Sequence, residues 1–149
     1  MGREGLMENR WTSASADGEH SDDLDACVHG SQLLGSDPAL VLHGGGNTSV
    51  KQPFHDLTGQ RIDALYVKGS GWDLATIERA GFAPLRHARL LELLALDSLS
   101  DMDMMRELSA ACLDPAAPAP SVETLLHALI PHKAVQHSHA DVIVTLTNT

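Results

Sequence analysis

The stretch VLHGGGNTSVK, residues 41–51, places three glycines, one amide and two hydroxyls directly behind a short apolar run. Glycine lets a ligand approach the main chain closely, and exposed backbone N–H groups favour phosphate. A dinucleotide G-x-G-x-x-G motif would need glycine where Ser49 stands, and the G-K-[ST] of a Walker A loop is absent here. The stretch therefore predicts a strand over 39–43 that feeds an anion-binding loop, without identifying the anion.

The rest of the chain alternates patterns typical of strands and helices. Further strands are expected at 64–71 and 134–139, and helices at 24–35, 72–81, 84–96 and after the N-cap candidates Ser100 and Ser121. The proline-rich segment 114–120 must be a loop, because proline breaks a helix interior. The last stretch, 141–149, fits a strand or a helix equally well. This alternation predicts an α/β sandwich.

Length and composition indicate one globular domain with an acidic surface. The chain has 149 residues, 43% hydrophobic content and a formal charge of −10. Such a charge excludes nucleic acid and anionic membrane surfaces as partners, since both require a basic face. Acidic residues among serine, alanine and glycine near the start predict that residues 1–22 form a loose acidic leader.

The sequence favours a cytoplasmic location. No apolar run approaches the roughly 18 residues that a membrane span needs, and the N-terminus lacks the order of a secretory signal. Leu6 stands where a myristoylation motif requires serine or threonine. Cys27 and Cys112 have no metal-binding or redox spacing, so reduced, buried thiols are expected.

His137 and His139 form the strongest candidate pair for chemistry. In a strand, residues two apart point to the same face with their Cα atoms about 6.6 Å apart, so both imidazoles can reach one zinc ion. The alternative is a pair of half-exposed histidines on a solvated strand. Two ligands are also fewer than the three that catalytic zinc normally takes from protein.

Other polar residues have equally plain structural interpretations when each is taken alone. Glu123 can simply complement the dipole of the helix it begins, and Ser121 can be that helix's N-cap. Ser70 and Gly71 end a predicted strand in an open turn, which is a common place for binding and for no function at all.

Their order along the chain is more specific than any one of them. The blocks LVLHGGGNTSVK (40–51), LYVKGSGWDL (65–74), APAPSVETLLHALIP (117–131) and HSHADVIVTLTNT (137–149) follow one another. Together they resemble the class II aldolase/adducin family, and most closely the aldolase half of rhamnulose-1-phosphate aldolase/short-chain dehydrogenase fusion proteins. The likeness runs from about Leu33 to Thr149.

The resemblance implies a fold and a set of roles. It implies a three-layer α/β/α sandwich around a mostly antiparallel sheet, with residues 23–149 as the N-terminal portion of the domain. Many relatives carry a second serine where this chain has Val122. The roles are substrate phosphate binding for Asn47, Ser70, Gly71 and Ser121, acid–base catalysis for Glu123, and zinc binding for His137 and His139.

The implied reaction is retro-aldol cleavage of a ketose 1-phosphate, which leaves an enediolate on the dihydroxyacetone phosphate fragment. Zinc would act as the Lewis acid and Glu123 would move the proton. The family's third zinc histidine lies beyond Thr149, so we expect a domain that is incomplete at its C-terminal end. We also expect Glu123 to coordinate the metal when substrate is absent. Family members are homo-oligomers. An epimerase, a dehydratase or a non-catalytic adducin-like module remains an alternative.

Overall fold

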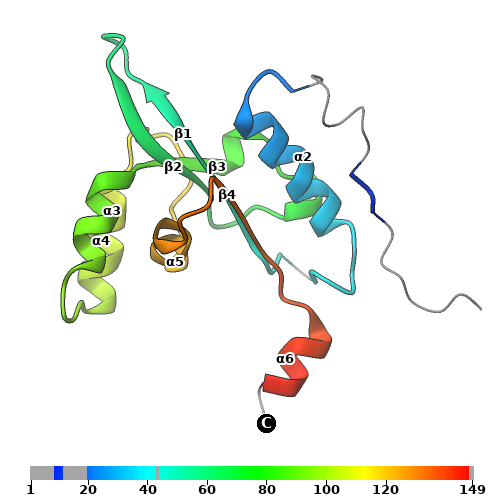
Figure 1. Ribbon diagram of the computed structural model, residues 1–149. Helices are drawn as coiled ribbons and strands as arrows, with labels where there is room; N and C mark the ends of the chain where they lie inside the picture. The colour runs from blue at the N-terminus through cyan, green and yellow to red at the C-terminus, as the bar shows by residue number, and fades with distance from the viewer. Residues whose placement is uncertain (1–8, 12–19, 43, 148–149) are drawn as a thin grey trace, which may run out of the picture.

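A computed structural model describes residues 9–11, 20–42 and 44–147. Its centre is an antiparallel sheet with strand order β3-β2-β1-β4 (Figure 1). The strands are β1 (Asn47–His55), β2 (Arg61–Lys68), β3 (Phe82–Arg86) and β4 (Ala134–His137). The helices are α2 (Asp23–Gly35), α3 (His87–Leu94), α4 (Asp101–Ala111), α5 (Thr124–Leu129) and α6 (Asp141–Thr147), with short 3-10 turns η1 (Leu74–Thr76) and η2 (Arg79–Gly81).

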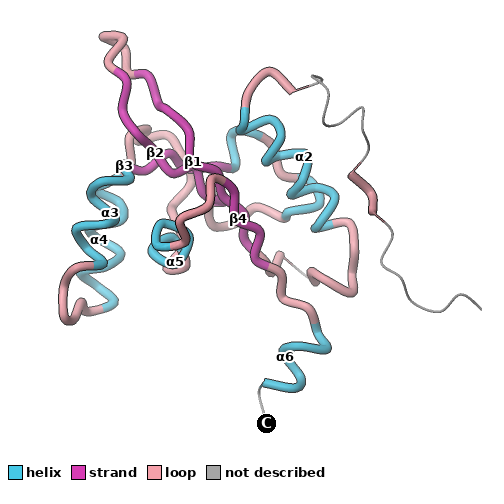
Figure 2. The backbone as a smooth tube through the Cα atoms, in the orientation of Figure 1, coloured by secondary structure: helices cyan, strands magenta, loops and turns pink. Residues whose placement is uncertain are grey.

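Helices cover both faces of the sheet, which gives the three layers that the resemblance implied. In Figure 2, α2 lies on one side of the strands, and α3, α4 and α5 lie on the other. The structure therefore confirms the α/β sandwich, with every strand pair antiparallel. Within the described residues, no helix is long and apolar enough to cross a membrane.

The first four residues of β1 are buried, because alternate side chains of the strand pack against the helices on opposite faces of the sheet. Thr48 bonds to Ser31 of α2 at 2.7 Å, and Val50 joins the apolar cluster on that same side. Ser49 and Lys51 point the other way and bond to α5 and the loop after it. The second half of the stretch 41–51 thus begins β1, one of the two inner strands of the sheet.

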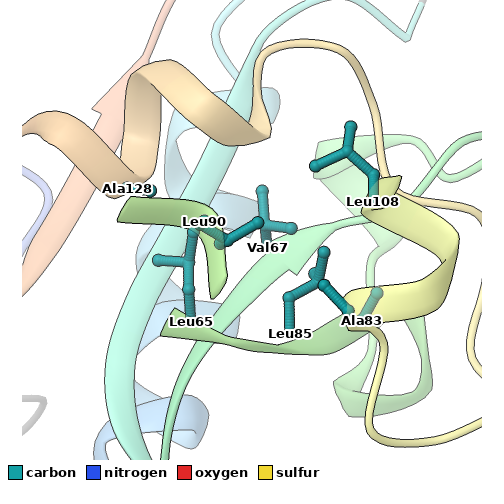
Figure 3. Packing of buried hydrophobic residues seen from close by; sticks show 8 residues of the cluster. Leu65, Val67, Ala83, Leu85, Leu90, Leu108 and Ala128 are labelled. Atoms are coloured by element: carbon teal, nitrogen blue, oxygen red, sulfur yellow. The ribbon is translucent and has the colours of Figure 1, made fainter. Parts of the chain in front are cut away.

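The main apolar core lies between the sheet and helices α3, α4 and α5 (Figure 3). Leu65 and Val67 of β2 are wholly buried there, two residues apart, as expected for one face of a strand. Leu90 and Leu108 supply the facing helical surfaces, also with no exposed area. A smaller cluster of Leu24, Val50, Ile77 and Phe82 fills the α2 side.

Two helix predictions are confirmed, and for one of them the predicted N-cap is confirmed as well. The helix expected at 24–35 is α2, and the side chain of its N-cap Asp22 accepts a hydrogen bond from the backbone N–H of Asp25. Ser100 caps α4 as predicted, accepting from the N–H of Asp103 at 3.2 Å. These signals are local, so the sequence alone carries them.

Three predicted elements are wrong in type over part or all of their length, and the strands predicted at 64–71 and 134–139 end earlier, at Lys68 and His137. The segment 39–42 is a turn and loop, and the strand instead begins at Asn47, because a short apolar run fits a buried loop as well as a strand. The expected helix at 72–81 is only η1 and η2. The expected helix at 84–96 starts as β3, an edge strand where Pro84 is tolerated, and becomes helical at His87.

The ends of the chain add smaller findings. The ambiguous segment 141–149 is helical over its described part, as α6. Most of the leader predicted at 1–22 lies outside the described residues. Within it, Arg10 forms an ion pair with Asp37, and Asp22 forms one with Arg79.

Candidate functional site

The sheet's register brings three separate chain segments to one end of the sheet. Asn47 at the start of β1 is paired with His137 at the end of β4. Ser49 is paired with Val67 near the end of β2, so the turn after Lys68 lies at that same end. Antiparallel pairing makes this unavoidable, since the start of one strand meets the ends of its neighbours.

A fourth segment, the proline-rich loop before α5, is fastened to the turn after β2. Gly69 forms an isolated β-bridge with Pro120, and the Ser70 N–H donates to the Ala119 carbonyl at 2.8 Å. A Cβ added at Gly69 would lie 2.3 Å from Cγ of Pro118, so only glycine allows this approach. The loop is held where it delivers Ser121 and Glu123 to the site.

Asn47 connects the glycine-rich stretch to the acidic residue. Its side chain is almost fully buried at 2% exposure. Its Nδ2 donates to Ser121 Oγ at 3.0 Å and to Glu123 Oε2 at 2.9 Å. Its Oδ1 is buried and has no partner among the described residues. The Asn47 amide therefore orients the Glu123 carboxylate, and its Oδ1 can still accept a hydrogen bond.

Ser121 is not the N-cap that the sequence predicted. Glu123 occupies the N-cap position of α5, because the helix begins at Thr124. The Ser121 hydroxyl still accepts from the Glu123 N–H, at 3.2 Å, and its carbonyl accepts from the Thr124 N–H. Ser121 thus holds the backbone of Glu123 and Thr124 by hydrogen bonds, although it is not the N-cap of the helix.

Glu123, His137 and His139 form a group with the composition of a metal site. One ligand atom from each lies within 4.8 Å of the others. Glu123 Oε1 is 3.8 Å from His137 Nδ1 and 3.7 Å from His139 Nε2, and the two rings meet edge to face at 4.9 Å. Nδ1 of His137 is buried and has no hydrogen-bond partner among the described residues. Imidazole nitrogens with a carboxylate oxygen are a donor set that suits zinc.

The histidines converge by a different geometry from the one predicted. Strand β4 ends at His137, so His139 does not share a strand face with it. Residues 138–140 after the strand have no regular secondary structure, and there the His139 ring meets the His137 ring edge to face. The two histidines do meet as predicted, but His139 lies after the strand and not on it.

Ser70 and Gly71 lie on the exposed turn after β2. Gly71 has φ +85°, a conformation that favours glycine, and nothing lies within 4 Å of a Cβ built there. Through the bond from Ser70 to Ala119, this turn is tied to the segment that carries Ser121. All four residues expected to bind phosphate thus lie on segments that meet at this end of the sheet.

Two buried polar residues beside the site, Lys68 and His127, are not among the site residues that the sequence predicted. Lys68 is 7% exposed, and burial lowers its pKa while the charges of Glu123 and Asp73 act in the opposite direction. His127 is wholly buried, and that burial lowers its pKa to about 4. His127 comes four residues after Glu123, and this helical spacing was the one signal available for it.

Comparisons with known proteins identify the family of the chain. The family model described as "Class II Aldolase and Adducin N-terminal domain" matches residues 26–149. A curated protein of Bacillus subtilis (strain 168), "Uncharacterized oxidoreductase YuxG", is 38% identical over 141 residues, covering 95% of this chain. The chain spans 20% of that relative's length.

A solved structure shows the same fold. It is described as the N-terminal class II aldolase domain of a conserved protein from Thermoplasma acidophilum, with a TM-score of 0.87 and 46% identity. The match covers 97% of this chain and 65% of the solved chain. The chain therefore belongs to the class II aldolase and adducin family.

Proposed function

We propose that this chain is the module of a zinc-dependent aldolase that cleaves a ketose 1-phosphate of the rhamnulose 1-phosphate type. The products would be dihydroxyacetone phosphate and an aldehyde. The observation that carries the proposal is Glu123, whose carboxylate lies beside His137 and His139 and is bonded to Asn47. A carboxylate between metal-binding groups and amide donors suits proton transfer at a carbon next to a carbonyl.

The substrate phosphate would bind where the strand ends meet. Ser70 and Ser121 offer neutral hydroxyl donors beside Asn47, whose Nδ2 is bonded to Ser121, and Gly71 leaves the main chain open to close approach. The positive charge of buried Lys68 nearby favours an anion in the same place. Holding the phosphate fixes the carbon skeleton against Glu123, which lowers the entropic part of the barrier.

Zinc, when bound by these histidines, would supply the Lewis acid that stabilises the negative charge left by carbon–carbon cleavage. The protein's own share of the work is proton transfer and orientation. Glu123 would accept the proton released by the hydroxyl that becomes the aldehyde and return it to the enediolate carbon. The amide of Asn47 holds Oε2 so that Oε1 faces the histidines. Because Asn47 is buried, this orientation is set before substrate arrives.

The test is Glu123→Gln, assayed by release of dihydroxyacetone phosphate from rhamnulose 1-phosphate. We expect turnover to fall by at least about 100-fold, because amide replaces the proton-transferring group. Glu78→Gln is the matched control, since Glu78 is exposed and lies outside the site. Full turnover by Glu123→Gln would refute the proposal.

The same assay separates the alternatives within the family. Product analysis with several phosphorylated ketoses and pentuloses would reveal an epimerase, by an inverted centre, or a dehydratase, by loss of water. A chain that turns over none of them, while a partner pull-down survives His137→Ala and His139→Ala, would instead be an adducin-like interaction module.

A further inference from the structure

His127 is a wholly buried polar residue that the proposed chemistry does not use. It lies on α5 and has no exposed area. Its Nδ1 is 2.8 Å from Oγ of Ser49 on β1, a hydroxyl that is itself 1% exposed. A buried hydrogen bond of this kind fixes the plane of the imidazole ring, because no water can replace the lost partner.

The other side of the His127 ring faces the candidate metal ligands. Its centroid lies 6.1 Å from that of His137, with the ring planes tilted by 39°. Its Nε2 is buried and has no hydrogen-bond partner among the described residues, and the same holds for Nδ1 of His137. Nδ1 of His137 has only the Glu123 carboxylate nearby, at 3.8 Å, which is beyond hydrogen-bond distance. Two buried ring nitrogens without hydrogen bonds on neighbouring histidines are unusual, since most such atoms are bonded.

The sheet register explains why these groups meet. Asn47 and Ser49 are two residues apart on β1, so their side chains leave the same face toward α5. Asn47 is paired with His137 and Ser49 with Val135 across β1 and β4. His127 therefore bonds to Ser49, which is the next residue on the same face of β1 after Asn47, the strand partner of His137.

We infer that His127, oriented by Ser49, is a positioning residue that fixes the side chain of His137 within the ligand set. The inference rests on the metal centre in the proposed function. Residues that surround metal-binding histidines set the orientation of the ligand ring and affect metal affinity without touching the metal. A neutral imidazole suits this place, because a charged neighbour would repel a bound cation.

A purely structural role for His127 makes a different prediction. Its loss would then weaken folding and leave metal affinity per folded molecule unchanged. His87 provides the comparison, because its Nε2 lies 3.3 Å from the carbonyl of Ala128 and so contacts the same helix. Replacing His87 disturbs α5 without touching the contact with His137.

The experiment measures Co²⁺ affinity by visible absorption and the free energy of unfolding without metal. The variants are His127→Leu, Ser49→Ala and the double variant, with His87→Leu as control. The double variant guards against misfolding, since removing both partners of a buried hydrogen bond costs little. We expect His127→Leu and the double variant to weaken Co²⁺ binding about 10- to 100-fold, Ser49→Ala less, and His87→Leu under about twofold.

A second readout needs no metal. Three-bond couplings and ¹³C shifts of His137 report its χ1 rotamer, and we expect one rotamer in the wild type and averaging in His127→Leu. If the wild type binds Co²⁺ and His127→Leu binds it equally well, the inference is overturned while the proposed function stands. If the wild type binds no Co²⁺, the metal centre of the proposed function fails. The rotamer of His137 then decides the inference, and an unchanged rotamer in His127→Leu overturns it.

Discussion

Asn47 and His137 lie directly opposite each other on the neighbouring antiparallel strands β1 and β4. This pairing joins the glycine-rich stretch to the histidine pair at the far end of the chain. Side chains opposite each other across an antiparallel pair lie about 4.5–5.5 Å apart at Cβ. Glu123 is bonded to Asn47 and lies beside His137, so a single register determines how the candidate site is assembled.

Asn47→Ala tests whether Asn47 orients the Glu123 carboxylate for catalysis. The variant removes the bonds from Nδ2 to Ser121 and Glu123, so we expect about 1–2 kcal/mol lower stability and a lower kcat. Gln52→Ala is the control, because Gln52 is on the same strand but bonds to Leu24 of α2. Steady-state kinetics and urea unfolding check both. Equal kcat losses in the two variants would contradict a specific role for Asn47.

Gly71→Ala tests the open turn after β2. Gly71 and Gly59 have nearly the same positive φ, 85° and 83°, and nothing lies within 4 Å of a Cβ at either place. Each alanine should therefore cost about 1 kcal/mol of stability. Only Gly71→Ala should also raise KM for a sugar phosphate, because Gly59 lies in the β1–β2 hairpin turn. A KM raised by both variants would rule out a local effect.

Gly69→Ala should damage the site through packing alone. The new Cβ would lie 2.3 Å from Pro118, and relief of this clash must push the loop that carries Ser121 and Glu123. We expect a stability loss of about 1–3 kcal/mol from overpacking and a clear fall in Co²⁺ affinity. Thermal unfolding and Co²⁺ titration measure the two effects. Unchanged affinity would show that the loop and the metal ligands are not coupled.

His127 should make the metal-free protein sensitive to acid. Burial lowers its pKa from 6.5 to about 4, so below pH 6.5 the unfolded chain binds a proton that the folded chain does not. Stability is therefore full above about pH 6.5 and is lost toward pH 4, by about 3 kcal/mol for the whole shift.

The measurement is unfolding by urea between pH 4 and 7 with a chelator present, on the wild type and His127→Leu. The variant should show a flatter profile. Asp22, whose pKa is lowered chiefly by its hydrogen bond from Arg79, acts at lower pH and leaves this window largely unaffected. Parallel profiles for the two proteins would show that His127 does not cause the loss.

The sequence predicted what depends on neighbouring residues. The N-cap Ser100, the proline-rich loop and the α/β alternation follow from local chemistry, and all are present. It also placed His137 and His139 in one candidate site. It could not choose between strand and loop for a short apolar run, so 39–42 was misassigned, and it gave a helix at 72–81 where only two 3-10 turns form.

Tertiary structure decided which polar residues meet. Nothing in the sequence shows that Ser49 faces His127, or that Asn47 holds Glu123, because both contacts depend on strand register and on where α5 packs. A shift of register by one residue would turn Asn47 and Ser49 to the opposite face of the sheet. The residue types were therefore determined by the sequence, whereas their assembly into one site depends on long-range pairing and burial.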